Sequence, residues 1–191
     1  MKHLLISLFT IGILMAAKPA LAETTPPTLT DPANTVIMTL KGGDVYIQLR
    51  PDLAPNHTAR IKELTAQGFY NGIVFHRVID GFMAQTGDPT GTGMGGSGKK
   101  INAEFSPEPF ARGIVGMARS SSPDSADSQF FITFAPARFL DGQYTVVGKV
   151  VSGMEFVDKI QRGEPPASPD KIIAMKLAAP APAAEPTKAK E

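Results

Sequence analysis

The sequence of 191 residues contains no cysteine and no tryptophan. Without cysteine the chain cannot form a disulfide scaffold, a thiolate nucleophile, or a zinc or iron–sulfur site with cysteine ligands. Neither sign of charge is in excess, since 19 Lys and Arg stand against 18 Asp and Glu. A near-neutral chain is not expected to bind nucleic acid through a bulk electrostatic field. The hydrophobic content of 42% is that of a globular domain and too high for a disordered chain.

The first 22 residues have the pattern of a secretory signal peptide. Lys2 opens a short positive region, residues 4–17 form an apolar run, and Ala20-Leu21-Ala22 supplies small residues at the cleavage positions. An uncleaved membrane anchor is the alternative, but the apolar run is short for a span, which needs about 20 residues. We therefore expect cleavage after Ala22, a location in the bacterial periplasm or outside the cell, and no membrane attachment afterwards. The mature chain would carry 17 bases against 18 acids, so neither nucleic acid nor an acidic membrane is an expected partner.

Proline is unevenly distributed along the chain. Ten of the 17 prolines lie before Asn34 or after Gly163, in segments that bury little apolar surface and are typical of linkers and tails. We predict a linker at residues 23–33, one folded domain at residues 34–177, and a disordered Ala/Pro-rich tail at residues 178–191. The predicted domain is long enough for one hydrophobic core, and we expect it to be a monomer.

Short β-rich segments dominate the predicted domain. Strands are expected at residues 35–40, 44–49, 74–79, 82–86, 113–118, 128–134, 144–151 and 172–177. One helix is expected to start at Pro55 and to stop at Gly68, and a second at residues 154–160. Many short strands with two isolated helices indicate a mainly β fold, a closed eight-stranded antiparallel barrel capped by two α-helices.

Several partial motifs lack the context that their chemistry requires. Residues 93–100 nearly form a phosphate-binding loop, but Lys100 occupies the place of the magnesium-binding Ser or Thr and no helix pattern follows. Residues 97–100 match the S-x-x-K of penicillin-recognising enzymes without the partner motifs. His57 and His76 have no metal-binding partner at helical spacing, and no nucleophile elbow is present. We therefore expect neither a metal nor a cofactor.

The segment Phe75-His-Arg-Val-Ile-Asp-Gly-Phe-Met-Ala-Gln85 resembles the signature of cyclophilin-type peptidyl-prolyl isomerases. The resemblance continues in the family's order through Gly87-Asp88, the glycine-rich loop, and residues 113–118, 128–132, 139–142, 147–151 and 153–154. It covers nearly all of residues 34–177 and is closest to the short bacterial periplasmic members. It implies an enzyme that accelerates rotation about X–Pro bonds in folding exported proteins. A chaperone-like binder of Pro-containing segments, with incidental catalysis, is the alternative.

The chemistry of this reaction suggests a role for Arg77. Rotation about a peptide bond is opposed by about 18–20 kcal/mol because amide resonance must be broken. In the twisted state the proline nitrogen regains a lone pair, and a donor aimed at that nitrogen stabilises the twisted state and not the planar one. The guanidinium of Arg77 is always charged and presents a rigid fork of N–H donors. With the family's neighbouring residues around it, Arg77 is expected to be catalytic, whereas alone it would be interpreted as part of a surface salt bridge.

The resemblance also implies a substrate-binding site, composed of Phe82, Met83, Gln85, Ala118, Arg119, Gln129, Phe131, Phe139, Leu140 and Tyr144. The apolar slot for the proline ring is lined by Phe82, Met83, Phe131 and Leu140. Gln85 and the backbone of Arg119 hold the amides of the substrate.

The turn at Asp80-Gly81 raises a geometric difficulty for this site. An ideal two-residue hairpin there places Gln85 on the opposite face of the sheet from Arg77. For the two side chains to meet, the strand needs a bulge or a strong twist, and bulges are frequent beside active sites.

Three features differ from the familiar eukaryotic form of the family. Phe139 stands where that form has a Trp whose indole helps to bind cyclosporin, so we expect weak cyclosporin binding with isomerase activity retained. Tyr144 aligns where a His commonly lines the pocket. The segment from Arg119 to Asp127 is slightly longer, and we expect it to shape the pocket that faces the residues before proline.

Overall fold

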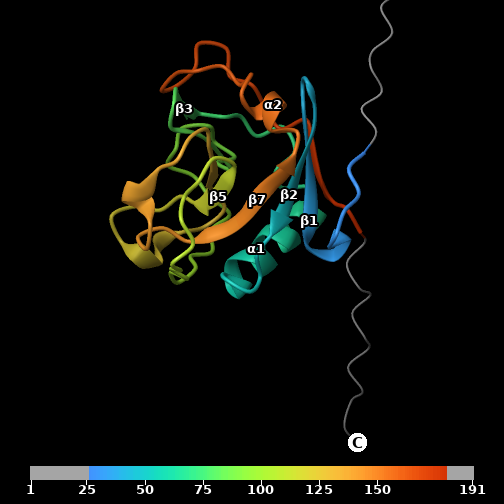
Figure 1. Cartoon of the computed structure of the whole chain (residues 1–191). Helices are drawn as coiled ribbons and strands as arrows, with labels where there is room; N and C mark the ends of the chain where they lie inside the picture. The colour runs from blue at the N-terminus through green and yellow to red at the C-terminus, as the bar shows by residue number, and fades with distance from the viewer. Residues whose placement is uncertain (1–25, 180–191) are drawn as a thin grey trace, which may run out of the picture.

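One antiparallel sheet of eight short strands forms the body of the protein (Figure 1). The structure is a computed structural model that describes residues 26–179. The predicted signal peptide and nearly all of the predicted tail lie outside the described residues. The strands are β1 (Thr35–Leu40), β2 (Gly43–Leu49), β3 (Arg77–Ile79), β4 (Met83–Thr86), β5 (Ile114–Met117), β6 (Phe130–Thr133), β7 (Val146–Ser152) and β8 (Ala174–Leu177).

Two α-helices accompany the sheet, α1 (Pro55–Ala66) and α2 (Met154–Val157), together with 3-10 helices at Pro32–Asn34, Pro123–Ser125 and Arg138–Leu140. Helix α1 starts at the predicted proline. Helix α2 is shorter than predicted, because beyond Val157 the chain continues in tighter turns, in which the amide of Ile160 donates to the carbonyl of Val157. Between residues 26 and 179, no helix is long and apolar enough to cross a membrane.

The sheet is open and has the strand order β3-β4-β6-β5-β7-β2-β1-β8. Its two edge strands, β3 and β8, do not pair with each other, so the predicted closed barrel is wrong and the fold is a half-barrel. Among the described residues, isolated bridges of Val74 with Lys171 and of Val78 with Gly163 are the β contacts beside these edges. Residues 161–170 contain three prolines, which have no N–H to donate to a ladder. The mainly β, antiparallel class with two helices agrees with the prediction.

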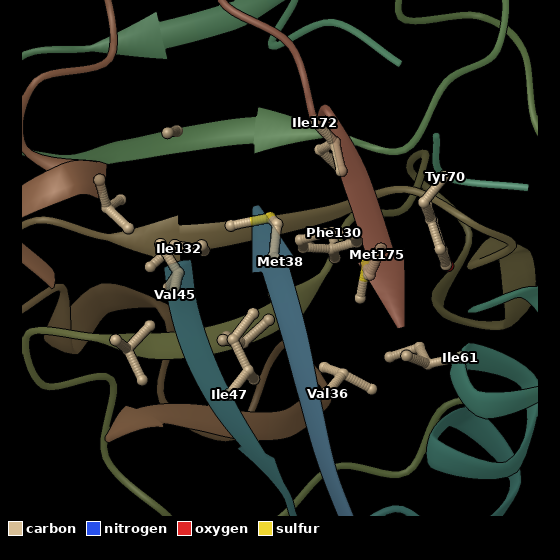
Figure 2. Packing of buried hydrophobic residues seen from close by; sticks show 14 of the residues in the cluster. Val36, Met38, Val45, Ile47, Ile61, Tyr70, Phe130, Ile132, Ile172 and Met175 are labelled. Carbon is tan, nitrogen blue, oxygen red and sulfur yellow. The ribbon is translucent and has the colours of Figure 1, made fainter. Parts of the chain in front are cut away.

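The alternation of side chains along the strands divides the apolar residues between two clusters. On β6, Phe130 and Ile132 belong to the main core, together with Val36, Met38, Val45 and Ile47 of β1 and β2 and Ile61 of α1 (Figure 2). The intervening Phe131 points to the other face and belongs to a second cluster with Met83, Phe110, Ile114, Ala137, Leu140 and Val146. Because both faces of β5 and β6 are covered, all four residues of each strand are buried.

A carboxylate far along the sequence caps the start of α1. Ala54 stands at the N-cap and offers no side-chain acceptor. Instead, Glu104 accepts hydrogen bonds from the backbone amides of Asn56 and His57, at 3.1 and 3.0 Å, and pairs with Nδ1 of the buried His57 at 2.7 Å. Burial alone would raise the pKa of Glu104, but these hydrogen bonds lower it below its usual value. His57 is therefore part of a helix cap that also fixes the loop around residue 104.

Two buried aspartates hold the glycine-rich loop of residues 87–100. Asp88, with 1% of its surface exposed, accepts hydrogen bonds from the backbone amides of Thr90, Gly93 and Gly95 at 2.7, 2.6 and 3.1 Å. Asp127 accepts hydrogen bonds from the amides of residues 97 and 98. A Cβ atom at Gly95 would lie 2.2 Å from the Asp88 carboxylate, so glycine is required for this close approach. The backbone amides of this loop therefore bind two carboxylates of the protein itself, and the loop is not a phosphate-binding loop.

Acid is expected to weaken the fold through Asp88. Burial alone would raise the pKa of Asp88, but the hydrogen bonds from Thr90, Gly95 and Gly93 lower it to about 2. A depressed pKa stabilises the fold above the ordinary value of about 3.9, and this stabilisation, about 2 kcal/mol, is lost as the pH falls from about 4 to 2. Urea unfolding at a series of pH values measures it.

Asp88→Asn removes the titrating group while keeping one acceptor oxygen. We expect this variant to be less stable at pH 5 by about 1–3 kcal/mol and to lose less stability than the parent protein between pH 4 and 2. Parallel stability curves of the two proteins over this range would show that Asp88 does not carry the effect.

Candidate active site

The β3–β4 turn is one residue longer than the sequence suggests. Arg77 pairs with Gln85 and Ile79 with Met83, so three residues, and not two, connect the strands. The amide of Phe82 donates to the carbonyl of Ile79 at 3.1 Å, and Gly81 adopts a φ of 67°, which the third position of a type II turn requires. The predicted two-residue hairpin is therefore wrong. The longer turn puts Arg77 and Gln85 on the same face without a bulge.

The pairing of four strands aligns the site residues in one row across the sheet. Arg77 of β3 lies opposite Gln85 of β4, Gln85 lies opposite Phe131 of β6, and Phe131 lies opposite Gly116 of β5. Directly opposed residues share a face of a sheet. The row therefore presents a guanidinium, an amide and an aromatic ring next to one another, from strands far apart in sequence.

Gly116 makes room for the ring of Phe131. A Cβ atom at position 116 would lie 2.5 Å from Cζ of Phe131 and 2.7 Å from Cε1 of Phe110. The two rings stack with centroids 5.7 Å apart, and both are buried. Phe131 is thus held between the sheet and the second cluster, so its position in the site is fixed by packing.

A cleft of about 390 Å³ opens over this row, lined by Arg77, Phe82, Met83, Gln85, Ala118, Arg119, Phe131, Phe139, Leu140, Gln143 and Tyr144. Ten of these residues are among the eleven expected from the sequence. Met83, Phe131 and Leu140 are buried and form its apolar floor. The structure therefore brings two arginines, Arg77 and Arg119, together with an apolar floor in one cleft.

The rim of the cleft is aromatic. Phe139, in the 3-10 helix, has 65% of its surface exposed and lies 5.2 Å from the ring of Phe82. Tyr144 meets Phe131 edge-on, with centroids 5.9 Å apart. The guanidinium of Arg119 covers Tyr144 at 4.5 Å and donates hydrogen bonds to the carbonyl of Gln143. These contacts fix the wall of the cleft. Gln143 also lines the cleft, although it was not among the residues predicted from the sequence.

Gln129 is the one expected site residue that does not line the cleft. Its side-chain oxygen accepts a hydrogen bond from Nε2 of Gln85 at 2.9 Å, and its own Nε2 donates to the carbonyls of Gly93 and Gly95 at 3.0 and 2.8 Å. It therefore connects Gln85 to the glycine-rich loop. A neighbouring depression of about 370 Å³ lies between this loop and residues 118–129 and shares Gln85, Ala118 and Arg119 with the cleft.

Arg77 has a partner that sequence reasoning also missed. Its Nε donates to Oε2 of Glu164 at 2.8 Å, and both side chains are about half exposed, at 43% and 52%. Glu164 belongs to a proline-rich segment that the sequence suggests to be linker-like. Since 87 residues separate the two, no local pattern could have paired them.

A second cation, Arg119, lines the same cleft as Arg77, but its guanidinium lies over the ring of Tyr144 and donates to the carbonyl of Gln143. The neighbouring His76 is buried, and burial lowers its pKa; the charge of Asp88 opposes this shift, and the charge of Arg77 adds to it. The net shift favours the neutral form of the His76 imidazole. In the part of the chain from residue 26 to 179, no three His, Asp or Glu side chains converge in the manner of a metal site.

Comparisons with known proteins identify the class that this fold and cleft define. The family model described as "Cyclophilin type peptidyl-prolyl cis-trans isomerase/CLD" matches residues 35–177. The chain is 58% identical to a probable peptidyl-prolyl cis-trans isomerase of Brucella suis, with 75% of this chain and 82% of the relative covered. It is 46% identical to the peptidyl-prolyl cis-trans isomerase-like 3 of Rattus norvegicus, with 63% and 77% covered.

Solved structures agree with this class. The cyclophilin AquaCyp293 of Hirschia baltica superposes with a TM-score of 0.71 at 30% identity, with 77% of this chain and 74% of that chain covered. A cyclophilin-type isomerase of Cryptosporidium parvum, solved in the presence of the dipeptide Ala-Pro, gives a TM-score of 0.69 at 31% identity, with 75% and 98% covered. The chain belongs to the cyclophilin-type peptidyl-prolyl cis-trans isomerases, which confirms the resemblance and the prediction of an enzyme.

The close packing beneath Phe131 leads to a prediction for Gly116→Ala. The added methyl group must displace the rings of Phe131 and Phe110. We expect the free energy of unfolding to fall by about 1–3 kcal/mol, and kcat/KM on an X–Pro peptide to fall about tenfold, equivalent to about 1.4 kcal/mol. Chemical unfolding and an isomerisation assay measure the two effects.

Gly148→Ala is the matched control, because its Cβ would lie 2.7 Å from the backbone oxygen of Gln48 and not against the cleft. It is expected to destabilise the fold while the folded enzyme keeps its kcat/KM within about twofold. Equal loss of activity in both variants would mean that the position of Phe131 is not what Gly116 protects.

Proposed function

We propose that the protein accelerates rotation about X–Pro bonds by seating the proline ring on Phe131 and directing the guanidinium of Arg77 to the proline nitrogen. The observation that carries this mechanism is the cross-strand row, in which Arg77, Gln85 and Phe131 lie opposite one another in turn. An apolar slot and a strong hydrogen-bond donor then face the same small volume of the cleft.

The physical reason for catalysis is a difference between two states of the substrate. In planar X–Pro amides the nitrogen lone pair is delocalised into the carbonyl and is a poor acceptor. As the bond twists, the lone pair returns to nitrogen, and a donor fixed beside the ring binds the twisted state more strongly than the planar one. An always-charged guanidinium meets this requirement without any proton transfer.

The remaining polar groups of the cleft are suited to a peptide backbone. The backbone groups of Arg119 make no hydrogen bond to another described residue, so they are available to substrate amides. Gln85 is held by Gln129 in an orientation that faces the cleft. The Cryptosporidium parvum relative was solved in the presence of an Ala-Pro dipeptide, which supports Pro-containing polypeptides as the substrates here.

The neighbouring depression is suited to the residues before proline. It is lined by the glycine-rich loop and by part of the segment from Arg119 to Asp127, and Lys100 and Met94 lie at its margin. We propose that this segment sets the preference for the residue before proline. A chaperone-like binder would need the apolar slot and this depression but would gain nothing from the guanidinium, which favours the enzyme.

We further propose that the enzyme acts on exported proteins in the periplasm. The support is the signal-peptide pattern at residues 1–22 and the absence of cysteine from the whole chain, which makes folding independent of oxidation. N-terminal sequencing of the exported protein tests cleavage after Ala22. The family match over residues 35–177 supports a folded domain at residues 34–177, and we propose that this domain works as a monomer.

Arg77→Ala is the decisive variant for the mechanism. In a protease-coupled isomerisation assay on a short X–Pro peptide, we expect kcat/KM to fall at least about tenfold, equivalent to about 1.4 kcal/mol of transition-state stabilisation. Arg112→Ala removes a half-exposed arginine that pairs with Asp158 outside the cleft and should leave the rate unchanged. If Arg77→Ala is as fast as the parent enzyme, the mechanism is wrong; if the parent enzyme itself does not accelerate the reaction, the binder is the better description.

Cyclosporin is expected to bind weakly, because Phe139 at the rim cannot donate a hydrogen bond. We expect Phe139→Trp to lower the inhibition constant of cyclosporin about three- to tenfold, the equivalent of one hydrogen bond, with isomerase activity retained. Phe139→Leu, which also lacks a donor, should not lower it. Inhibition by cyclosporin that is the same for parent and Trp variant would contradict this account of the rim.

A further inference from the structure

We propose that Glu164 is a positioning residue for Arg77, a role that rests on the catalytic function proposed for that arginine. Glu164 holds the guanidinium by its Nε and so aims the two terminal nitrogens into the cleft. It comes from the segment of residues 161–170, which follows α2 and lies along the free edge of β3.

The hydrogen bond to Glu164 constrains a side chain that is otherwise free. Arg77 is 43% exposed, and a long exposed side chain loses much rotamer freedom when it is fixed in one orientation. Among residues 26–179, Glu164 is the only hydrogen-bond partner of the Arg77 guanidinium, and the bond is made by Nε at 2.8 Å. Both terminal nitrogens therefore remain available to a substrate, so Glu164 orients the donor without occupying it.

The backbone places Glu164 in register with the catalytic row. The amide of Val78 donates to the carbonyl of Gly163 at 2.8 Å, and the amide of Gly163 donates to the carbonyl of Val78 at 2.8 Å. In this antiparallel bridge the residue before Val78 lies opposite the residue after Gly163. Arg77 thus has Glu164 as its neighbour on one side and Gln85 on the other, and the row across the sheet begins with Glu164.

Arg162 fixes the same segment at its start. Its Nε donates to Oδ1 of Asp80 in the β3–β4 turn at 3.0 Å, and Nη1 donates to the carbonyls of Asp158 and Ile160 at 2.9 and 2.6 Å. Its guanidinium also lies 4.1 Å from the ring centroid of Phe134. The segment is therefore tied to both the end of α2 and the turn that precedes β4. Glu164 is presented on an anchored backbone and not on a loose loop.

A stabilising role does not account for this pair. Exposed ion pairs contribute little to the free energy of unfolding, because solvent screens them and two side chains must be ordered. Arg60 and Glu63 of α1 form an ion pair at 2.7 Å away from the cleft, in which Glu63 is exposed and Arg60 is 12% exposed. The two glutamates are alike in exposure, at 52% and 49%, so Glu63→Ala is a matched control for Glu164→Ala.

The test is a double-mutant cycle in the protease-coupled assay. We expect Glu164→Ala to lower kcat/KM about fivefold, equivalent to about 1 kcal/mol, through kcat and not KM, while its thermal midpoint matches that of Glu63→Ala. In the Arg77→Ala background, Glu164→Ala should have no further effect. Glu164→Gln keeps an acceptor for Nε and should restore kcat/KM to within about twofold of the parent enzyme.

The orientation of the guanidinium can be observed directly. The Nε–Hε resonance of Arg77 is expected to shift on Glu164→Ala and to remain near its parent position in Glu164→Gln. An unchanged kcat/KM in Glu164→Ala overturns the positioning role, as does an equal loss in the Arg77→Ala background or a Gln variant as slow as the Ala variant. If Arg77→Ala alone is as fast as the parent enzyme, the proposed mechanism has failed, and this result is distinct from the others.

Discussion

The antiparallel pairing of β3, β4, β6 and β5 is the constraint on which the site depends. Hydrogen-bonded register places Arg77, Gln85, Phe131 and Gly116 in one line across the sheet, and a shift of one residue in any strand would send a side chain to the opposite face. The line joins a charged donor to an apolar floor. The placement of the donor and the floor on one face of the sheet is thus set by backbone geometry, before any loop contributes.

Packing around this row of residues keeps their side chains in place. The alternation along β6 sends Phe130 and Ile132 to the main core and Phe131 to the second cluster, so the floor of the cleft is supported by both. The buried carboxylates of Asp88 and Asp127 hold the glycine-rich loop in place. Gln129 donates to a carbonyl of this loop and accepts a hydrogen bond from Gln85, so the loop also fixes the orientation of Gln85. Rigidity of this kind suits a catalyst that must favour a twisted bond over a planar one.

The open edge of the sheet at β3 also shapes the surroundings of Arg77. A closed barrel would pair β3 along its whole length with another strand. Instead, a proline-rich segment bridges to Val78 at one position, through Gly163, and then turns away. This leaves room for Glu164 beside Arg77 and for Arg162 beside the β3–β4 turn. The open edge of the half-barrel is therefore what allows Glu164 to reach the guanidinium of Arg77.

The sequence by itself determined the mainly β class, the start of α1 at Pro55, the approximate strands and the family. These features depend on neighbouring residues: apolar and polar residues alternate along strands, glycine and proline mark their ends, and the family signature is the continuous segment from Phe75 to Gln85. Only the tertiary structure decided the open edge, the three-residue turn that joins Arg77 to Gln85, and the contacts of Glu164, Glu104 and Gln143. The physical reason is that register and long-range ion pairs arise from the packing of segments tens of residues apart, for which periodicity and spacing carry no signal.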